Sequence, residues 1–172
     1  MANTRCFYLA EGQCEEKLVR ALQEKPNLVL AGKVKRFNVI QNLIPEKRLI
    51  EFTPGCTVIL VFDTDTPETD CLKKNIGLLR TKGLRIEVKT VAQVLNFEDE
   101  IQRSTDVRRA QDLTKSESTG DFKSAVNRMK ASEFRGALKR HNLDMKELWN
   151  TTPPGTYDFI SQDGDKIKLR GK

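Results

Sequence analysis

Two aspartates follow the most apolar segment of the chain. Thr57 to Phe62 is a continuous β-branched and aromatic run, and Asp63 and Asp65 come directly after it. Side chains at positions i and i+2 of a strand point the same way, and two carboxylates on one side of a strand end repel each other unless a cation lies between them. The spacing therefore predicts a site for a hard divalent cation, although Asp is also common as a surface residue where strands stop.

A third acid stands at the end of an earlier apolar segment. Arg5 to Ala10 has the character of a buried strand, and Glu11 and Gly12 lie between it and an amphipathic stretch over residues 15–23. If the two strands are neighbours in a sheet, the Glu11 carboxylate completes a three-acid site with the two aspartates. Gly12 lets the backbone turn and leaves room for a phosphate to approach.

The elements that position these acids alternate between strand and helix. A second strand is expected within residues 28–40, and Thr57 to Phe62 is apolar enough to be buried on both faces of a parallel sheet. Pro67 is expected to open a helix that Gly83 stops, before a further strand over residues 84–91. Repeated strand-helix units predict an α/β fold, with a three-layer domain around a mostly parallel central sheet over residues 1–95.

The sequence pattern of residues 96–172 is typical of helices and is rich in basic residues. It predicts a helical, basic extension packed on that core. Helices are expected from Asn96, over residues 121–130 and over residues 132–140, with Ser132 as an N-cap. In the C-terminal tail, apolar and polar residues alternate on both sides of Asp163-Gly164, a pattern that favours a terminal hairpin.

The segment Phe7-Tyr-Leu-Ala-Glu-Gly-Gln-Cys-Glu-Glu16, followed about fifty residues later by Phe62-Asp-Thr-Asp65, resembles the Toprim domain. Topoisomerases, DnaG-type primases, small ribonucleases and OLD nucleases share this domain, and the resemblance covers about residues 4 to 95. It implies that Glu11 serves in acid-base chemistry and metal binding and that Asp63 and Asp65 bind Mg²⁺. Thr66-Pro-Glu-Thr69 stands where many members carry a glycine.

Three later segments are similar to the small stand-alone Toprim proteins of the OLD/RloB kind, which occur with prokaryotic defence systems. They are Val91 to Glu100, Asp121 to Ser124 and Met145 to Trp149. The similarity implies a second set of metal and transition-state residues, for which Glu98, Glu100 and Lys123 are the candidates. Acids at a helix N-terminus are also ordinary dipole-stabilising residues.

The resemblance implies a Mg²⁺-dependent nuclease that hydrolyses phosphodiesters of DNA or RNA, in prokaryotic anti-phage defence. The sequence carries no GxxxxGK[ST] loop, so an ATP-driven function would need a separate ATPase subunit. A homodimer is left open.

The basic charge is concentrated in the second half of the chain. The net charge is +6, with 15 basic and 14 acidic residues up to residue 100 and 15 basic and 10 acidic residues after it. The basic residues of the second half can contact the phosphates of a nucleic acid. The alternative interpretation is that they form an ordinary solvent-exposed face. The candidates for nucleic-acid binding are Arg103, Arg108, Arg109, Arg128, Lys139 and Arg140.

Two other functions compete with a nuclease. Asp63-Thr-Asp-Thr66 also fits the opening motif of haloacid-dehalogenase phosphatases, whose first Asp is a nucleophile. Those enzymes need a later Lys and a further acidic pair after another strand, whereas residues 84–91 are followed by Ala92-Gln93. A catalytically silent Toprim-like module that binds nucleic acid or signals to a partner is the second alternative.

The location expected is the cytoplasm, without a membrane partner. The longest apolar run is far shorter than the roughly 20 residues that span a bilayer, and the segment Met1 to Arg5 lacks the layout of a signal peptide. The four cysteines have no zinc or redox spacing, so structural thiols are expected.

Overall fold

The computed structural model describes residues 5–81 and 85–169. The strands are β1 (Cys6–Ala10), β2 (Gly32–Arg36), β3 (Thr57–Asp63) and β4 (Glu87–Gln93). The α-helices are α1 (Gln13–Gln23), α2 (Glu46–Leu49), α3 (Asp70–Thr81), α4 (Phe97–Ser104), α5 (Thr119–Arg128), α6 (Ala131–Arg140) and α7 (Gly164–Ile167), and the 3-10 helices are η1 (Ala110–Leu113) and η2 (Gly155–Tyr157).

The four strands form one parallel sheet in the order β2-β1-β3-β4. This confirms the expected α/β class with a parallel central sheet. After β1 the chain adds β2 on one side, and it then returns to place β3 on the other side of β1. The strand order therefore reverses between β1 and β3, and in open α/β sheets ligands bind outside the carboxyl ends of the strands at such a point.

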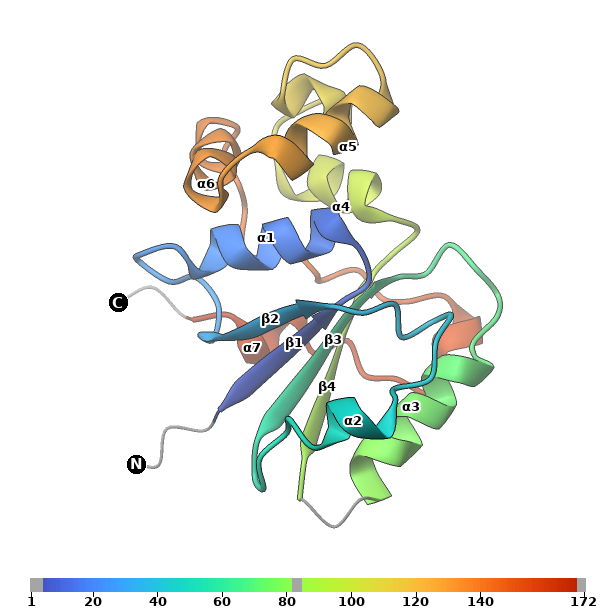
Figure 1. The fold of residues 1–172 in the computed structure, drawn as a ribbon. Coiled ribbons are helices and arrows are strands. Elements are labelled where there is room, and N and C mark those ends of the chain that lie inside the picture. The colour runs from blue at the N-terminus through green and yellow to red at the C-terminus, as the bar shows by residue number, and fades with distance from the viewer. Residues whose placement is uncertain (1–4, 82–84, 170–172) are drawn as a thin grey trace.

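Both faces of the sheet are covered, which gives three layers (Figure 1). In Figure 1, α1 lies above the sheet and α4, α5 and α6 lie above α1, whereas α2 and α3 lie below it. Side chains of β3 alternate between the two cores: Ile59 and Val61 face the α1 side, and Val58, Leu60 and Phe62 face the α3 side. This is why β3 has the unbroken apolar sequence of a strand that is buried twice.

Helix α1 joins the predicted core to the predicted extension. Its apolar stripe of Leu18, Val19 and Leu22 is fully buried, and α1 packs on both α5 and α6. The core on this side of the sheet also contains Phe122 and Phe134 from those helices. The first helix therefore contacts the sheet on one flank and the later helices on the other.

The C-terminal segment closes the free edge of β4. Backbone Thr90 N donates to Asp163 Oδ2 at 3.0 Å, and Asp163 N donates to Thr90 O at 2.8 Å. Gln162 bonds both backbone groups of Ala92 in the same way, at 2.7 and 3.1 Å. An edge strand with unpaired backbone groups would be open to association, and here side chains and backbone satisfy those groups.

The expected terminal hairpin is wrong. Residues 155–169 instead form η2, α7 and one isolated antiparallel bridge between Val29 and Lys168. Tyr157 and Ile167 are both buried, but in the cores on opposite sides of the sheet, so the segment must travel between the layers. Gly164 permits close packing here, since a Cβ on it would collide with the Trp149 backbone oxygen.

Two helix boundaries differ from the expected ones. Helix α3 begins at Asp70 rather than at Pro67, and the predicted stop at Gly83 lies outside the described residues. Helix α6 has Lys130 rather than Ser132 as its N-cap, because Glu133 accepts a hydrogen bond from the Lys130 backbone N–H at 2.7 Å. Helix α4 begins as expected, with the Asn96 side chain accepting from Asp99 N.

Within residues 5–81 and 85–169, every helix is too short or too polar to span a bilayer.

Candidate functional site

The carboxyl ends of β1 and β3 bring the two acidic segments together. Asp63 is the last residue of β3, and Glu11 follows β1 directly. The strands are paired in parallel with Ala10 opposite Val61, and Glu11 N donates to Val61 O at 2.9 Å. Glu11 and Asp63 therefore lie side by side at the point where the strand order reverses.

The Glu11 carboxylate links the ends of three neighbouring strands. Its Oε2 accepts a hydrogen bond from the Asp63 backbone N–H at 2.9 Å. Its Oε1 accepts from Asn38 Nδ2 at 3.1 Å, and Asn38 lies just beyond β2. The Asn38 carboxamide is fixed in turn, because its Oδ1 accepts from the backbone N–H groups of Ile40 and Gln41. Asn38 is thus a site residue that sequence reasoning missed.

The Asp63 side chain lacks compensation for its charge. Its Oδ1 is buried and, within the described part of the chain, has no hydrogen-bond partner. Burial, followed by the nearby charges of Glu15, Glu11 and Asp65, raises the pKa of this carboxyl to about 9, although the Phe97 backbone N–H acts to lower it. At neutral pH the group therefore holds a proton unless a cation replaces it.

Glu15 is a third acid of the site. It lies in the first turn of α1, its side chain is only 5% exposed, and burial raises its pKa to about 7. Glu15 precedes Leu18, Val19 and Leu22 by three, four and seven residues, so it lies on the buried face of the helix. That periodicity was the available signal for an inward-facing acid.

Gly12 leaves the space that Glu15 occupies. A Cβ at position 12 would lie 2.7 Å from Glu15 Oε2. The Gly12 backbone is extended, with φ −134°, a conformation that any residue adopts. A side chain at position 12 would therefore displace the Glu15 carboxylate rather than strain the backbone.

These residues surround an open pocket of about 320 Å³. We call it the acidic pocket, and it is lined by Glu11, Gly12, Gln13, Cys14, Glu15, Asn38, Asp63, Lys123 and Asn127. Burial raises the pKa of the Cys14 thiol to about 12, which keeps it protonated and makes it a poor metal ligand. The polar lining is dominated by three carboxylates and one ammonium group.

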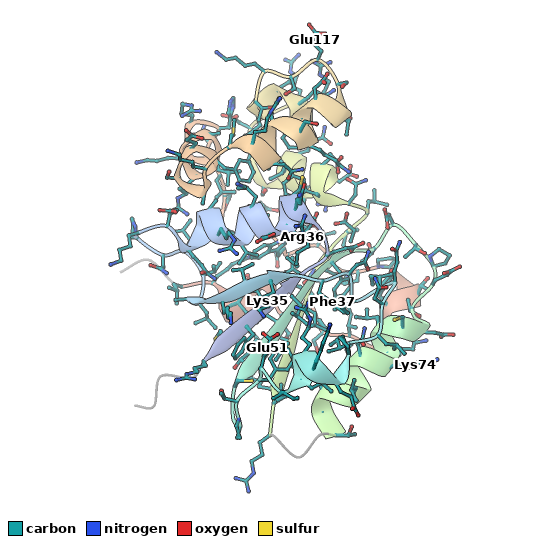
Figure 2. All side chains as sticks on the ribbon, in the orientation of Figure 1. Lys35, Arg36, Phe37, Glu51, Lys74 and Glu117 are labelled. Atoms are coloured by element: carbon teal, nitrogen blue, oxygen red, sulfur yellow. The ribbon has the colours of Figure 1, made fainter. Side chains whose placement is uncertain are left out.

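Asp65 lies outside the acidic pocket. It is exposed and lines a separate hollow of about 730 Å³, which it shares with Glu11 and with Lys74 of α3 (Lys74 is labelled in Figure 2). Strand β3 ends at Asp63, so the strand alternation that would align Asp65 with Asp63 no longer applies. The charge of Asp65 still acts on both neighbours, since it raises the pKa values of Glu11 and Asp63.

Lys123 and Glu98 form an ion pair at the mouth of the acidic pocket. Lys123 Nζ lies 2.8 Å from Glu98 Oε1, with side-chain exposures of 49% and 13%. The pair raises the pKa of Lys123, and Glu98 Oε2 is buried without a hydrogen-bond partner among the described residues. Both predicted residues therefore lie near the pocket, with Lys123 in its lining.

Glu100 is placed elsewhere. It is fully buried, its Oε2 pairs with Arg103 at 2.9 Å, and its Oε1 accepts from the Trp149 backbone N–H at 2.5 Å. The carboxylate therefore anchors the segment around Trp149 to α4 and does not line the acidic pocket.

The six predicted nucleic-acid contacts divide into two groups. Arg103 is bonded to Glu100 and to the Val94 carbonyl at 2.7 Å, which is a structural arrangement. Arg109 pairs with Asp112 at 2.8 Å on the surface. The remaining four are exposed, and they are Arg108, Arg128, Lys139 and Arg140.

The chemistry of the acidic pocket fits a hard divalent cation. Carboxylate oxygens are the ligands that Mg²⁺ and Mn²⁺ prefer, and the buried, unpartnered Asp63 Oδ1 offers one such ligand. Glu11, Glu15 and Asp63 would hold the cation. Within the described ranges, no group of three Asp, Glu, Cys or His side chains is already arranged to hold a metal ion, so binding would require these side chains to turn toward one another.

No protein-family model, no curated protein and no solved structure matches this chain.

Proposed function

We propose that the protein is a Toprim-like, Mg²⁺-dependent nuclease that hydrolyses phosphodiester bonds at the acidic pocket. The observation that carries the proposal is the Asp63 carboxylate, whose Oδ1 is buried without a partner among the described residues and which lies beside Glu11 and Glu15. Burying an uncompensated acid is costly, and a cluster of such acids in a pocket is typical of a functional site. The position at the strand-order reversal supports the same reading.

The chain's own residues have separable roles in this proposal. Asn38 and the Asp63 backbone N–H orient Glu11, and Glu11, Glu15 and Asp63 supply the cation ligands. A bound Mg²⁺ or Mn²⁺ neutralises the negative charge that develops on the phosphate. Lys123 can leave Glu98 for a phosphate oxygen, because it lines the pocket and its side chain is half exposed. Water would then add to phosphorus as the P–O ester bond breaks, and the proton that the water loses balances the one that the leaving oxygen takes up.

The biological setting is part of the proposal through the sequence resemblance alone. A role in prokaryotic anti-phage defence and a separate ATPase subunit would follow from kinship with the OLD/RloB proteins. DNA and RNA remain equal candidates as substrates.

The test compares cleavage by the wild type, Asp63→Asn and Glu11→Gln on duplex DNA, single-stranded DNA and tRNA with Mg²⁺ or Mn²⁺. Each variant should lose activity by at least about 100-fold. Glu117→Gln is the matched control, since Glu117 is an exposed acid at the far end of the helical layer (Figure 2). A wild type that is inert on every substrate would favour the silent binding module, and phosphate release from small phosphomonoesters alone would favour the phosphatase.

A further inference from the structure

A groove runs along one flank of α1 and begins at the acidic pocket. A small hollow of about 150 Å³ adjoins that pocket and shares Gln13 and Asn127 with it. Arg20 also lines a larger hollow of about 560 Å³ that reaches Lys25 and Ala131. We call the two hollows together the α1 groove, and it leads from the three carboxylates toward the end of α1.

The acids along the α1 groove already have cationic neighbours. Glu16 Oε1 pairs with Arg20 at 2.9 Å, and Glu16 Oε2 lies 3.9 Å from Arg36. Figure 2 shows Arg36 at the end of β2 nearest α1, whereas its neighbour Lys35 lies toward Glu51. Arg36 thus adds a second positive charge beside Glu16, the acid that lines the smaller hollow.

The cations of the groove exceed its acids. Lys17 Nζ donates to the neutral Met129 carbonyl, and among the residues that the structure describes no carboxylate pairs with it. Lys25 is exposed at the far end, and the second acid there, Glu24, interacts with the charge of Arg135. A groove with excess positive charge and amide side chains along its length is typical of a surface that follows a phosphate backbone.

The dimensions of the groove favour one strand. Residues 13–23 of α1 extend about 15 Å at a rise of about 1.5 Å per residue, a length that a short run of nucleotides spans. The smaller of its two hollows, about 150 Å³, lies next to the acidic pocket, and there Lys17 reaches from α1 to Met129 at the end of α5. A hollow of this volume can take a backbone phosphate but has no room for a base pair, which favours a single strand.

From these features we infer that the α1 groove binds the phosphate backbone of a single-stranded nucleic acid and leads it to the acidic pocket. The inference deepens the proposed nuclease function by naming the substrate form and its path. Lys17, Arg20 and Lys25 are the contacts that neutralise phosphates, and Gln13 and Asn127 lie where the strand enters the acidic pocket.

The test measures binding without cleavage. The anisotropy of labelled single-stranded DNA, single-stranded RNA and a duplex of the same sequence is measured with the whole chain in EDTA, over a range of salt concentrations. The groove variant combines Lys17→Gln, Arg20→Gln and Lys25→Gln. The matched control combines Lys47→Gln, Arg80→Gln and Lys146→Gln, three exposed cations outside the groove.

The groove variant should bind single strands at least about tenfold more weakly than the control. Its log-log salt slope should fall by about two, because each phosphate contact on a single strand contributes about 0.7. Equal binding by the two variants, or tighter binding of the duplex than of single strands, would overturn the inference. Thermal unfolding of both variants verifies that they are folded.

The outcome is separable from that of the proposed function. If the wild type binds through the groove but cleaves nothing with Mg²⁺ or Mn²⁺, the groove stands and the nuclease is refuted. If the wild type cleaves and the groove variant keeps the KM of the control, the nuclease stands and the groove is refuted.

Discussion

Replacing Asp63 by Asn should make the metal-free protein more stable at neutral pH, although it removes the central residue of the site. The two side chains have the same shape, and Asn carries no charge at any pH. Burial and the neighbouring acids raise the pKa of Asp63 from 3.8 to about 9. The neutral amide therefore resembles the form that the folded protein prefers.

The sign and size of the effect follow from proton linkage. Between about pH 4 and pH 9 the folded state retains a proton that the unfolded state has released, so the free energy of unfolding falls as pH rises through this window. The loss is at most about 1.4 kcal/mol per pH unit, which is about 4 kcal/mol at pH 7. Asp63 is only partly buried, and solvent reduces the loss to about 2 kcal/mol. Asp63→Asn should recover this amount, a rise in Tm of about 4–8 °C.

The assay is thermal unfolding of the wild type and of Asp63→Asn in EDTA and in Mg²⁺, at about pH 4 and about pH 8. The two proteins should agree at the lower pH, and the variant should be more stable at the higher pH. Mg²⁺ at a hundredfold excess over its Kd should stabilise the wild type by about 2.7 kcal/mol and leave the variant unchanged. Glu117→Gln should behave as the wild type throughout.

A lower Tm for Asp63→Asn than for the wild type at pH 8 in EDTA would refute this reasoning. It would mean that the Asp63 carboxylate is charged and stabilising in the fold. The unpartnered oxygen would then have a structural partner, and the case for a cation at this position would fail.

Three further predictions concern the residues around Asp63. Glu15→Gln should raise stability above pH 7 by about 3 kcal/mol in chemical denaturation. Burial raises the pKa of Glu15 from 4.5 to about 7, so the folded wild type loses stability between about pH 4.5 and pH 7. No gain at pH 8 would contradict the buried placement. Gly12→Ala should leave the Tm in EDTA almost unchanged but weaken Mn²⁺ binding, measured by calorimetry, by about tenfold. The new Cβ would lie 2.7 Å from Glu15 Oε2 and would displace this ligand. Unchanged affinity would show that Glu15 is no ligand. Glu100→Gln should destabilise the protein by about 3 kcal/mol, because Arg103 would stay partly buried without its partner. The stabilisation by Mg²⁺ should persist in this variant. Loss of the Mg²⁺ response in a folded variant would show that Glu100 belongs to the metal site.

The sequence by itself determined the strands and the acids at their ends. The unbroken apolar run of β3 predicts a strand covered on both faces, and Ile59 and Leu60 do lie in opposite cores. Because parallel strands meet at one edge of a sheet, the acids that follow β1 and β3 were expected to converge if the strands were neighbours. The strand order confirms that adjacency, and Glu11 contacts Asp63 at 2.9 Å.

Only the tertiary structure decided which acids share a pocket. Strand periodicity ends where β3 ends, so it could not place Asp65, which lines a different hollow. Glu100 is an ordinary first-turn acid by sequence, and its burial depends on the Trp149 segment, about fifty residues away along the chain, packing against α4. The tail has the alternation of apolar and polar residues that a hairpin would have, yet its buried residues belong to two different cores. Local pattern specifies elements and faces, whereas contacts between distant segments decide which charges meet.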